Sequence, residues 1–503
     1  MRKIKTFRSD TKKSLKVRNK ELLDFIDYEV RDKEYNSLLK WLSKIISIPV
    51  EVLEKESKIF IHKNYLAKKA KFKNIFNFTK IFKSILTFFG FFFWIYLFSK
   101  SESKIKTTHA DIIVDDVLDE MEAKNFWGLK KYFSKVLFVS KVKLSNEYDH
   151  LCFKYKNLNK KILFSKIPII CSVGFFLILK SSVKLKINLL DIFSYLIRQT
   201  FKCENLFTQI KSKYLIQLRP YGTSEIKRFI YHKHGGKVVS VIQKNPEQLT
   251  RPGGTAYADI LFTLGLKTGE NAIVSGGNYN KIIPVGSLVM ESWFFNANIN
   301  DEKIPLYDLM SITGNYSEFS DGTENYISSY YEHCRWLKKF AEEFPKLSVV
   351  IKRRPGDGTE KNFTFLNFFK NSKVKIISGE ENFDDKKEWK AFVAHSYHHA
   401  FKAKVICTWQ STMGLEFIGN GKPCIFMDPG GYNNSIFFNN ETYNKIKAKT
   451  YEEFKKTYFE IVNGTSKMFN LKKEDYCLRS DNVSKRISDC LKNGSTLERY
   501  LNE

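Results

Sequence analysis

The segment 405–431 combines a strand, a turn, a helix and a second strand in immediate succession. A short β-prone run opens it, and Ser411 and Thr412 follow with hydroxyls that are typical of a helix start. Residues 413–419 then carry apolar side chains at helical spacing, and 423–427 resumes as a buried strand. This order predicts a βαβ unit within a parallel sheet.

The turn of such a unit attracts anions. Free backbone N–H groups and the positive end of the helix dipole point outward at the carboxyl end of the first strand. Gln410, Ser411, Thr412, Met413 and Gly414 would lie there. A Ser-Thr pair is also a common N-cap of a helix that binds nothing, so the pair alone leaves both interpretations open.

Composition limits the classes of partner. The chain has 503 residues, of which 43% are hydrophobic, enough for two to four domains with sizeable cores. Its 83 basic and 54 acidic residues give a net charge of +29, which favours anionic partners. We expect no nucleic acid among them, because the sequence lacks a ribonucleoprotein motif, zinc-finger spacing and a Gly-Arg tract.

Neither a metal nor another cofactor is expected. The densest histidine group is His395, His398 and His399, and it has no further ligand at a sensible spacing. The 8 cysteines include no CxxC pair and lie partly in apolar runs, which predicts buried reduced thiols and a cytosolic compartment.

Two uncharged runs interrupt the first half, at 84–99 and 167–179. Both are shorter than the ~20 residues that a spanning helix needs. The first contains Trp94 and Tyr96 and follows a segment, 61–83, with seven lysines and no acid. It predicts peripheral attachment to the anionic inner face of the cell membrane, with a buried element as the alternative. The second run is expected to be buried in the N-terminal domain.

The remaining pattern predicts an α/β fold with two facing Rossmann-like domains, because strand-like and helical segments alternate from about residue 105. We divide the chain into a basic helical extension (1–104), an acceptor domain (105–299), a nucleotide-donor domain (300–480) and a C-terminal tail (481–503). The expected strands are 110–116, 135–140, 213–218, 237–243, 258–264, 281–285, 306–313, 348–352, 373–377, 405–408 and 423–427.

Two facing domains place a ligand cleft at the carboxyl ends of both sheets. Lys352, Arg353 and Arg354 leave a buried strand as three consecutive cations and are stopped by Pro355, so they are placed to neutralise a diphosphate. A solvated basic loop is the alternative interpretation.

In the first domain, the candidates for a base that activates the acceptor are His234, Asp115 and Asp116, because each would end a strand or helix near the cleft. A histidine in the place of His234 is also a common helix C-cap.

Together these motifs resemble the bacterial surface-polysaccharide glycosyltransferases of the GT-B fold. They fall within 210–435 and comprise 257–259, 282–287, 351–355, 411–416 and 421–423. The wider clan includes capsule synthases, polysialyltransferases and CDP-glycerol glycerophosphotransferases.

The resemblance implies that a Lys-x-His-Pro element meets the donor phosphate and that a Ser-Ser/Thr…Glu element, here Ser411, Thr412 and Glu416, binds the nucleotide. In this chain Arg354 and Pro355 stand where His-Pro would be. Arginine binds phosphate but does not act as an acid near neutral pH.

The sequence therefore predicts metal-independent transfer of a sugar or polyol phosphate from a nucleotide-activated donor to a glycan or lipid-linked acceptor in surface polysaccharide biosynthesis. Glu416 would accept hydrogen bonds from ribose hydroxyls. A sugar-nucleotide epimerase and a non-catalytic polysaccharide assembly or export factor are the alternatives.

Overall fold

The structure is a computed structural model of the 503-residue chain. It describes residues 32–61, 78–98, 107–152, 166–185, 187–219, 223–243, 256–269, 277–296, 305–313, 324–352, 368–377, 396–397, 399–409, 411–429 and 440–494.

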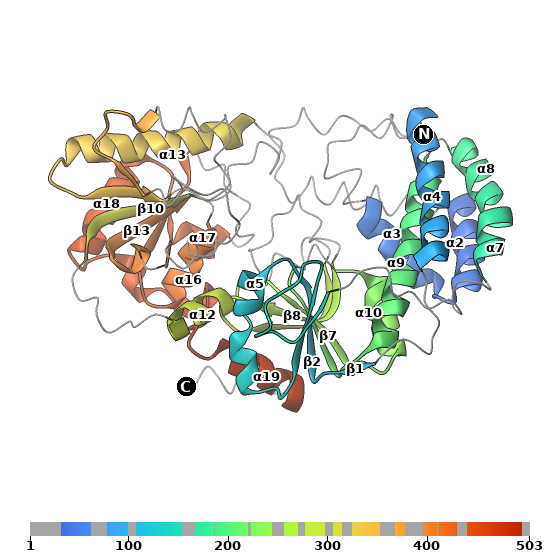
Figure 1. Cartoon of the computed structure of the whole chain (residues 1–503). Coiled ribbons are helices and arrows are strands. Elements are labelled where there is room, and N and C mark those ends of the chain that lie inside the picture. The colour runs from blue at the N-terminus through green and yellow to red at the C-terminus, as the bar shows by residue number, and fades with distance from the viewer. Residues whose placement is uncertain are drawn as a thin grey trace.

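The first lobe contains a sheet of seven parallel strands, drawn at the bottom centre of Figure 1. Counted along the chain, its spatial order is 3-2-1-4-5-6-7, in which the direction of winding reverses between the first and fourth strands. The order across the sheet is β4 (His150–Cys152), β3 (Val136–Ser140), β2 (Ile112–Val117), β6 (Tyr214–Gln217), β7 (Val238–Ile242), β8 (Tyr257–Thr263) and β9 (Asn278–Pro284).

The second lobe contains six parallel strands in the order 3-2-1-4-5-6. Both sheets are thus doubly wound and Rossmann-like, and the predicted α/β fold with two parallel sheets is confirmed. The strands are β12 (Lys375–Ile377), β11 (Val349–Lys352), β10 (Tyr307–Thr313), β13 (Ala403–Trp409), β14 (Cys424–Met427) and β15 (Lys447–Ala448). The short strands β4 and β15 were not predicted, and neither was the pair β1 (Thr108–His109) and β5 (Ile210–Lys211).

Helices cover both sheets. In the first lobe these are α5 (Glu120–Lys124), the 3-10 helix η4 (Trp127–Lys131), α10 (Glu225–Lys233), α12 (Leu288–Asn296) and α19 (Val483–Asn493). The second lobe has α13 (Glu324–Glu343), α16 (Met413–Gly419), α17 (Asn440–Asn444), α18 (Tyr451–Val462), η12 (Lys467–Asn470) and η13 (Lys473–Asp475). Val483 and Ile487 of α19 share a core with Ile112 and Val114 of β2, so α19 packs on the first lobe although it follows the second lobe in sequence.

A helical bundle packs on one face of the first sheet, at the right of Figure 1. Leu42 and Phe88 of the bundle share one hydrophobic core with Ile113 and Leu137 of the sheet, so the bundle is continuous with the first lobe. Its helices are α2 (Lys33–Ile46), α3 (Val50–Ile61), α4 (Phe78–Phe98), α7 (Ile167–Ile169), the π-helix η6 (Ile170–Gly174), α8 (Phe175–Leu185) and α9 (Leu189–Gln209).

Both uncharged runs are helical. The run 84–99 falls mostly within α4, and 167–179 lies within a continuous helical stretch, Ile167–Leu185, of 19 residues. This stretch is long and apolar enough to cross a membrane by length and composition, and only 28% of its most apolar window is buried. We expected 167–179 to be buried. Only the side of the helix that packs on the bundle is buried, and the other side is exposed.

The chain segment after η13 joins the lobes by lying between them. The N–H of Leu478 donates to the carbonyl of Leu264 (2.8 Å), just after β8 of the first lobe. On the other side, the N–H of Ser480 donates to Oδ1 of Asn420 (3.0 Å), just after α16 of the second lobe. The segment thus donates a backbone N–H to each lobe.

Glycines permit this close approach. A Cβ at Gly265 would lie 2.5 Å from the carbonyl carbon of Tyr476, and one at Gly419 would lie 2.2 Å from the carbonyl oxygen of Cys477. Gly286 has φ +97° and faces the carbonyl of Leu478. Any side chain at these positions would push the lobes apart.

We therefore expect Gly265→Ala to lower the free energy of unfolding by about 1–3 kcal/mol, because the clashing atoms are backbone and cannot rotate away. Gly90→Ala is the matched control: Gly90 lies within α4, no atom is within 4 Å of the position that a Cβ would take, and alanine there should stabilise by up to about 1 kcal/mol. Urea unfolding followed by circular dichroism measures both. An unchanged midpoint for Gly265→Ala would contradict the packing argument.

Candidate functional site

The carboxyl edge of the second sheet brings the predicted donor residues together. Ile312 of β10 pairs with Lys352 of β11 on one side and with Thr408 of β13 on the other. Lys352 and the turn after β13 thus lie on one edge, about 10 Å apart across β10. The predicted placement of Lys352 and Ser411 on one sheet edge is confirmed. The boundary between β10 and β13 is also the point where the winding reverses, where doubly wound sheets bind ligands.

Hydrogen bonds shape the turn before α16. The hydroxyl of Thr408 donates to the carbonyl of Ile312 (2.8 Å) and accepts from the N–H of Ser411 (3.2 Å). Ser411 Oγ accepts from the N–H of Met413 (3.4 Å). Ser411, Thr412 and Met413 are half-buried, so they line the edge without being sealed in the core.

Gly414 lets α16 pack closely on the sheet. A Cβ there would lie 2.7 Å from the ring of Phe426 and 2.8 Å from Cγ2 of Thr408. Its role in the structure is therefore close packing beneath the turn. The remaining predicted donor residues, Gln410, Arg353 and Arg354, lie outside the described residues.

Glu416 lies in the contact between the lobes. It is 5% exposed, and its carboxylate accepts from Ser287 Oγ (2.6 Å), just after β9 of the first lobe, and from the hydroxyl of Tyr397 (2.5 Å). Burial raises the pKa of this carboxyl above its ordinary value, although the two hydroxyls oppose the shift. The sequence analysis assigned this carboxylate to ribose hydroxyls. In the structure the hydroxyls of Ser287 and Tyr397 donate to it.

The Ser287–Glu416 hydrogen bond joins residues that follow strands of different sheets. Ser287 follows the carboxyl end of β9, and Glu416 is in the first turn after the carboxyl end of β13. The carboxyl edges of the two sheets therefore meet at the boundary between the lobes, as a shared ligand cleft requires.

Asp115 lies at the winding reversal of the first sheet, between β2 and β6, where it forms a buried ion pair with Lys227 of α10. Both side chains are 7% exposed. Burial alone would raise the pKa of Asp115, but the Lys227 ammonium outweighs it and holds the pKa below its ordinary value. An ionised carboxylate that is fully paired is a poor proton acceptor.

Asp116 presents a different environment. It has φ +62° within an irregularity of β2, and its side chain is 35% exposed. Arg219 donates to its carboxylate (3.1 Å) and to its carbonyl (2.9 Å), and also pairs with Glu122. Asp116 is thus the more accessible of the two acids at this edge.

Arg219 was missed by the sequence analysis. It follows the buried strand β6 and precedes Pro220, the same signal that singled out the cations before Pro355. Its side chain is 7% exposed and positions two carboxylates at the edge.

His234 lies elsewhere. It is the C-cap of α10, just before β7 begins, and therefore lies at the amino edge of the first sheet. Its Nε2 is 2.7 Å from Glu204 Oε2, and its Nδ1 is 3.3 Å from Lys211 Nζ. The expectation that His234 shares the cleft edge with Asp115 and Asp116 is not met, because a nine-residue helix separates the two ends.

A carboxylate from α3 occupies the N-terminus of α10. Glu56 of α3 is completely buried, and its Oε2 accepts from Ser224 Oγ (2.9 Å) and from the N–H of Ile226 (3.1 Å). The anion position after β6 of the first sheet is thus filled by a carboxylate of the chain itself.

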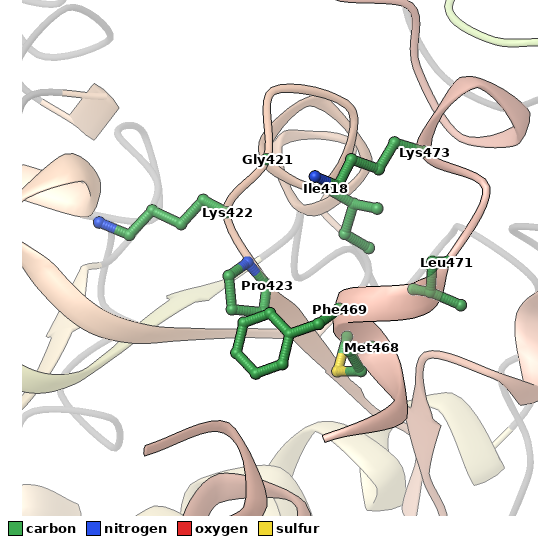
Figure 2. Close-up of a pocket in the computed structure, with 8 residues that line it drawn as sticks. All are labelled: Ile418, Gly421, Lys422, Pro423, Met468, Phe469, Leu471 and Lys473. Atoms are coloured by element: carbon green, nitrogen blue, oxygen red, sulfur yellow. The ribbon is translucent and has the colours of Figure 1, made fainter. Parts of the chain in front are cut away.

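A small hollow lies at the far end of α16, beneath the turn at Gly421 (Figure 2). In this view Lys422 points away from the hollow, and its Nζ hydrogen-bonds to the carbonyl of Phe401. The hollow is at the opposite end of the helix from Ser411. It is lined by Ile418, Gly421, Lys422, Pro423, Met468, Phe469, Leu471 and Lys473.

Other predicted features have structural roles. His399 Nδ1 is 2.8 Å from the hydroxyl of Tyr307, whereas His395 and His398 lie outside the described residues. No group of three potential metal ligands occurs among the residues that the structure describes. The cysteines at 171, 203, 334, 407, 424, 477 and 490 are free thiols, and all of these except Cys171 are buried.

Solved structures resemble this chain in overall arrangement. Staphylococcus aureus MnaA bound to UDP has 11% identity and a TM-score of 0.45, with 78% of this chain and 97% of that chain covered. UDP-GlcNAc 2-epimerase from Neisseria meningitidis bound to UDP-GlcNAc has 12% identity and a TM-score of 0.42, with 77% and 100% covered. Acinetobacter baumannii MurG has 8% identity and a TM-score of 0.37, with 76% and 99% covered.

All three TM-scores are below 0.5. No protein-family model matches the sequence, and no curated protein matches it.

A double-mutant cycle tests the ion pair between Asp115 and Lys227. Asp115→Asn or Lys227→Met alone should cost about 3–5 kcal/mol, because each leaves a buried partner uncompensated. The double variant should recover most of this loss, since no buried charge remains. Urea unfolding measures stability. A double variant that is as unstable as the worse single variant would contradict the pairing.

We predict that the effect of Glu416→Gln on thermal stability depends on pH. Because its pKa is raised in the folded state, its contribution to stability is fully present below its ordinary pKa of 4.5 and is lost as pH rises through the folded value. Glu416→Gln keeps an acceptor for Ser287 and does not ionise. Its thermal midpoint should exceed that of the wild type at pH 8, with the difference shrinking toward pH 4.5. A difference that is constant with pH would contradict this assignment.

Proposed function

We propose that the protein transfers a sugar or polyol phosphate from a nucleotide-activated donor to a glycan or lipid-linked acceptor. The observation that carries this proposal is the meeting of the two carboxyl edges through Ser287 and Glu416. Of these two edges, one holds the Ser411 turn and Lys352, and the other holds Asp116 and Arg219. In this proposal the edge of the second sheet binds the donor phosphate and the edge of the first sheet supplies the acid.

The donor would bind at the second sheet. Lys352 lies at the end of β11, and the turn before α16 brings the half-buried hydroxyls of Ser411 and Thr412. Charge that develops on a departing nucleotide diphosphate would be stabilised there by fixed donors. Arg353 and Arg354 directly follow Lys352 in the sequence and would extend this cationic side.

The acceptor would bind at the first sheet. Asp116 is the more exposed acid at that edge, and Arg219 holds its carboxylate in place. As a carboxylate, Asp116 would accept the proton of the attacking hydroxyl. Asp115 would serve as structural support, because Lys227 already pairs with it. This mechanism needs no metal, and surface polysaccharide biosynthesis is the setting that the motif resemblance suggests.

A nucleotide screen tests the donor site. CMP, CDP, UDP and GDP are added to the wild type and to Ser411→Ala, and the thermal midpoint is recorded. We expect one diphosphate to stabilise the wild type, by about 2.7 kcal/mol at 100 times its Kd, and we expect Ser411→Ala to weaken its binding by roughly tenfold.

Thr450→Ala is the matched control. Thr450 caps α18 through its hydroxyl, as Ser411 caps the turn before α16, so both variants lose about 1 kcal/mol of capping energy. Only Ser411→Ala should change nucleotide binding. Absence of stabilisation by every nucleotide, or equal effects in both variants, would refute the donor site.

With the stabilising nucleotide known, the corresponding nucleotide-sugar distinguishes the reactions. Release of free nucleoside diphosphate that requires a glycan or lipid acceptor indicates transfer. Conversion of the sugar without an acceptor indicates an epimerase, and binding without turnover indicates an assembly or export factor.

A further inference from the structure

Two helices of the bundle expose stripes of large apolar side chains. The exposed positions in α4 recur at intervals of three or four residues, which places them on one side of the helix. The stretch 167–185 has an equivalent stripe. The exposed residues are Phe82, Leu86, Phe89 and Phe93 in the first, and Ile169, Val173, Phe176 and Val183 in the second.

The two stripes are joined into one face. The ring of Phe89 in α4 lies 4.9 Å from that of Phe175 in α8, and Phe175 lies 5.6 Å from Phe176. Figure 1 draws α4 and α8 at the end of the molecule that is farthest from the second sheet. We refer to these eight exposed residues as the apolar face.

Polar contacts on the inner sides hold both helices in this orientation. In α4, Ser84 Oγ donates to Asp191 Oδ1 of α9 (2.5 Å). In α8, Ser181 Oγ donates to Glu34 Oε1 of α2 (2.7 Å). Gly174 packs against Trp41, where a Cβ would lie 2.3 Å from the indole ring. Rotating either helix to hide its stripe would break these contacts, so the apolar face is a fixed feature of the fold.

The charged residues of the two helical segments are all basic, and one of them, Lys184, pairs with Glu34 of the neighbouring helix α2. The sequences of α4 and of 167–185 contain no acidic residue, and Lys83 and Lys180 are exposed on them. In the sequence, 61–83 holds seven lysines and 153–166 holds five, both without an acid. A large apolar face with cationic flanks complements an anionic lipid surface, where burial and charge attraction both contribute.

We propose that the apolar face docks on an anionic phospholipid membrane, with α4 and α8 lying in the interface. Spanning is disfavoured because the inner side of 167–185 is tied to its neighbours: Ser181 donates to Glu34 of α2, and Ser182 Oγ accepts from the N–H of Leu189 in α9. The sequence predicted attachment through 84–99 alone, whereas the structure adds a second helix to the same surface. This inference stands independently of the donor site.

Vesicle flotation of the full chain tests the proposal. The wild type should float with vesicles of phosphatidylcholine and phosphatidylglycerol, and less with phosphatidylcholine alone. Phe93→Glu/Phe176→Glu alters side chains that are 65% and 69% exposed, so it should leave the fold intact and lower the partition coefficient by about tenfold or more. Lys83→Glu/Lys180→Glu should remove the preference for phosphatidylglycerol.

Leu306→Glu is the matched control, because Leu306 is 56% exposed on the second lobe and should leave flotation unchanged. Thermal midpoints establish that each variant is folded. The proposal is overturned if the folded wild type does not float, or if Phe93→Glu/Phe176→Glu floats like the wild type. It is also overturned if these substitutions dissociate a dimer that does not bind vesicles, or if bound protein resists alkaline carbonate as a spanning helix would.

Discussion

The contact between the two lobes is the constraint on which the rest of the structure depends. The segment Tyr476–Ser480 lies between them, and glycines on both sides bring backbone within contact distance of backbone. Beside it, the buried carboxyl of Glu416 joins the lobes through Ser287. Close packing without side chains leaves little freedom for the lobes to slide, so the carboxyl edges of the sheets keep their relation across the cleft.

Buried charge is used differently in the two lobes. In the first lobe, Glu56 fills the N-terminus of α10, and Lys227 neutralises Asp115. In the second lobe, the equivalent turn carries Ser411, and Lys352 lies on the same sheet edge across β10. The two lobes therefore differ in what occupies the turn after the fourth strand of each sheet.

Much of the fold was predictable because parallel α/β sheets leave a strong local signal. Buried strands are continuous apolar runs, and those ending near Asp116, Lys352 and Thr408 all formed as expected. The position of Lys352 and Ser411 on one sheet edge was also predictable, because the carboxyl ends of parallel strands lie at the same edge of a sheet. Short edge strands such as β4 and β15 escaped prediction, because a few residues carry no readable periodicity.

The sequence by itself determined the alternation of strands and helices, the position of hydroxyls and cations after strands, and the lysine-rich flanks of two apolar runs. The tertiary structure alone decided which side chains are engaged by distant partners. Asp115 meets Lys227, Glu416 meets Ser287, and His234 lies at the far end of α10 from the cleft. It also decided that the stripes of α4 and α8 form one outward face. These outcomes depend on contacts between residues far apart in the chain, which local periodicity does not encode.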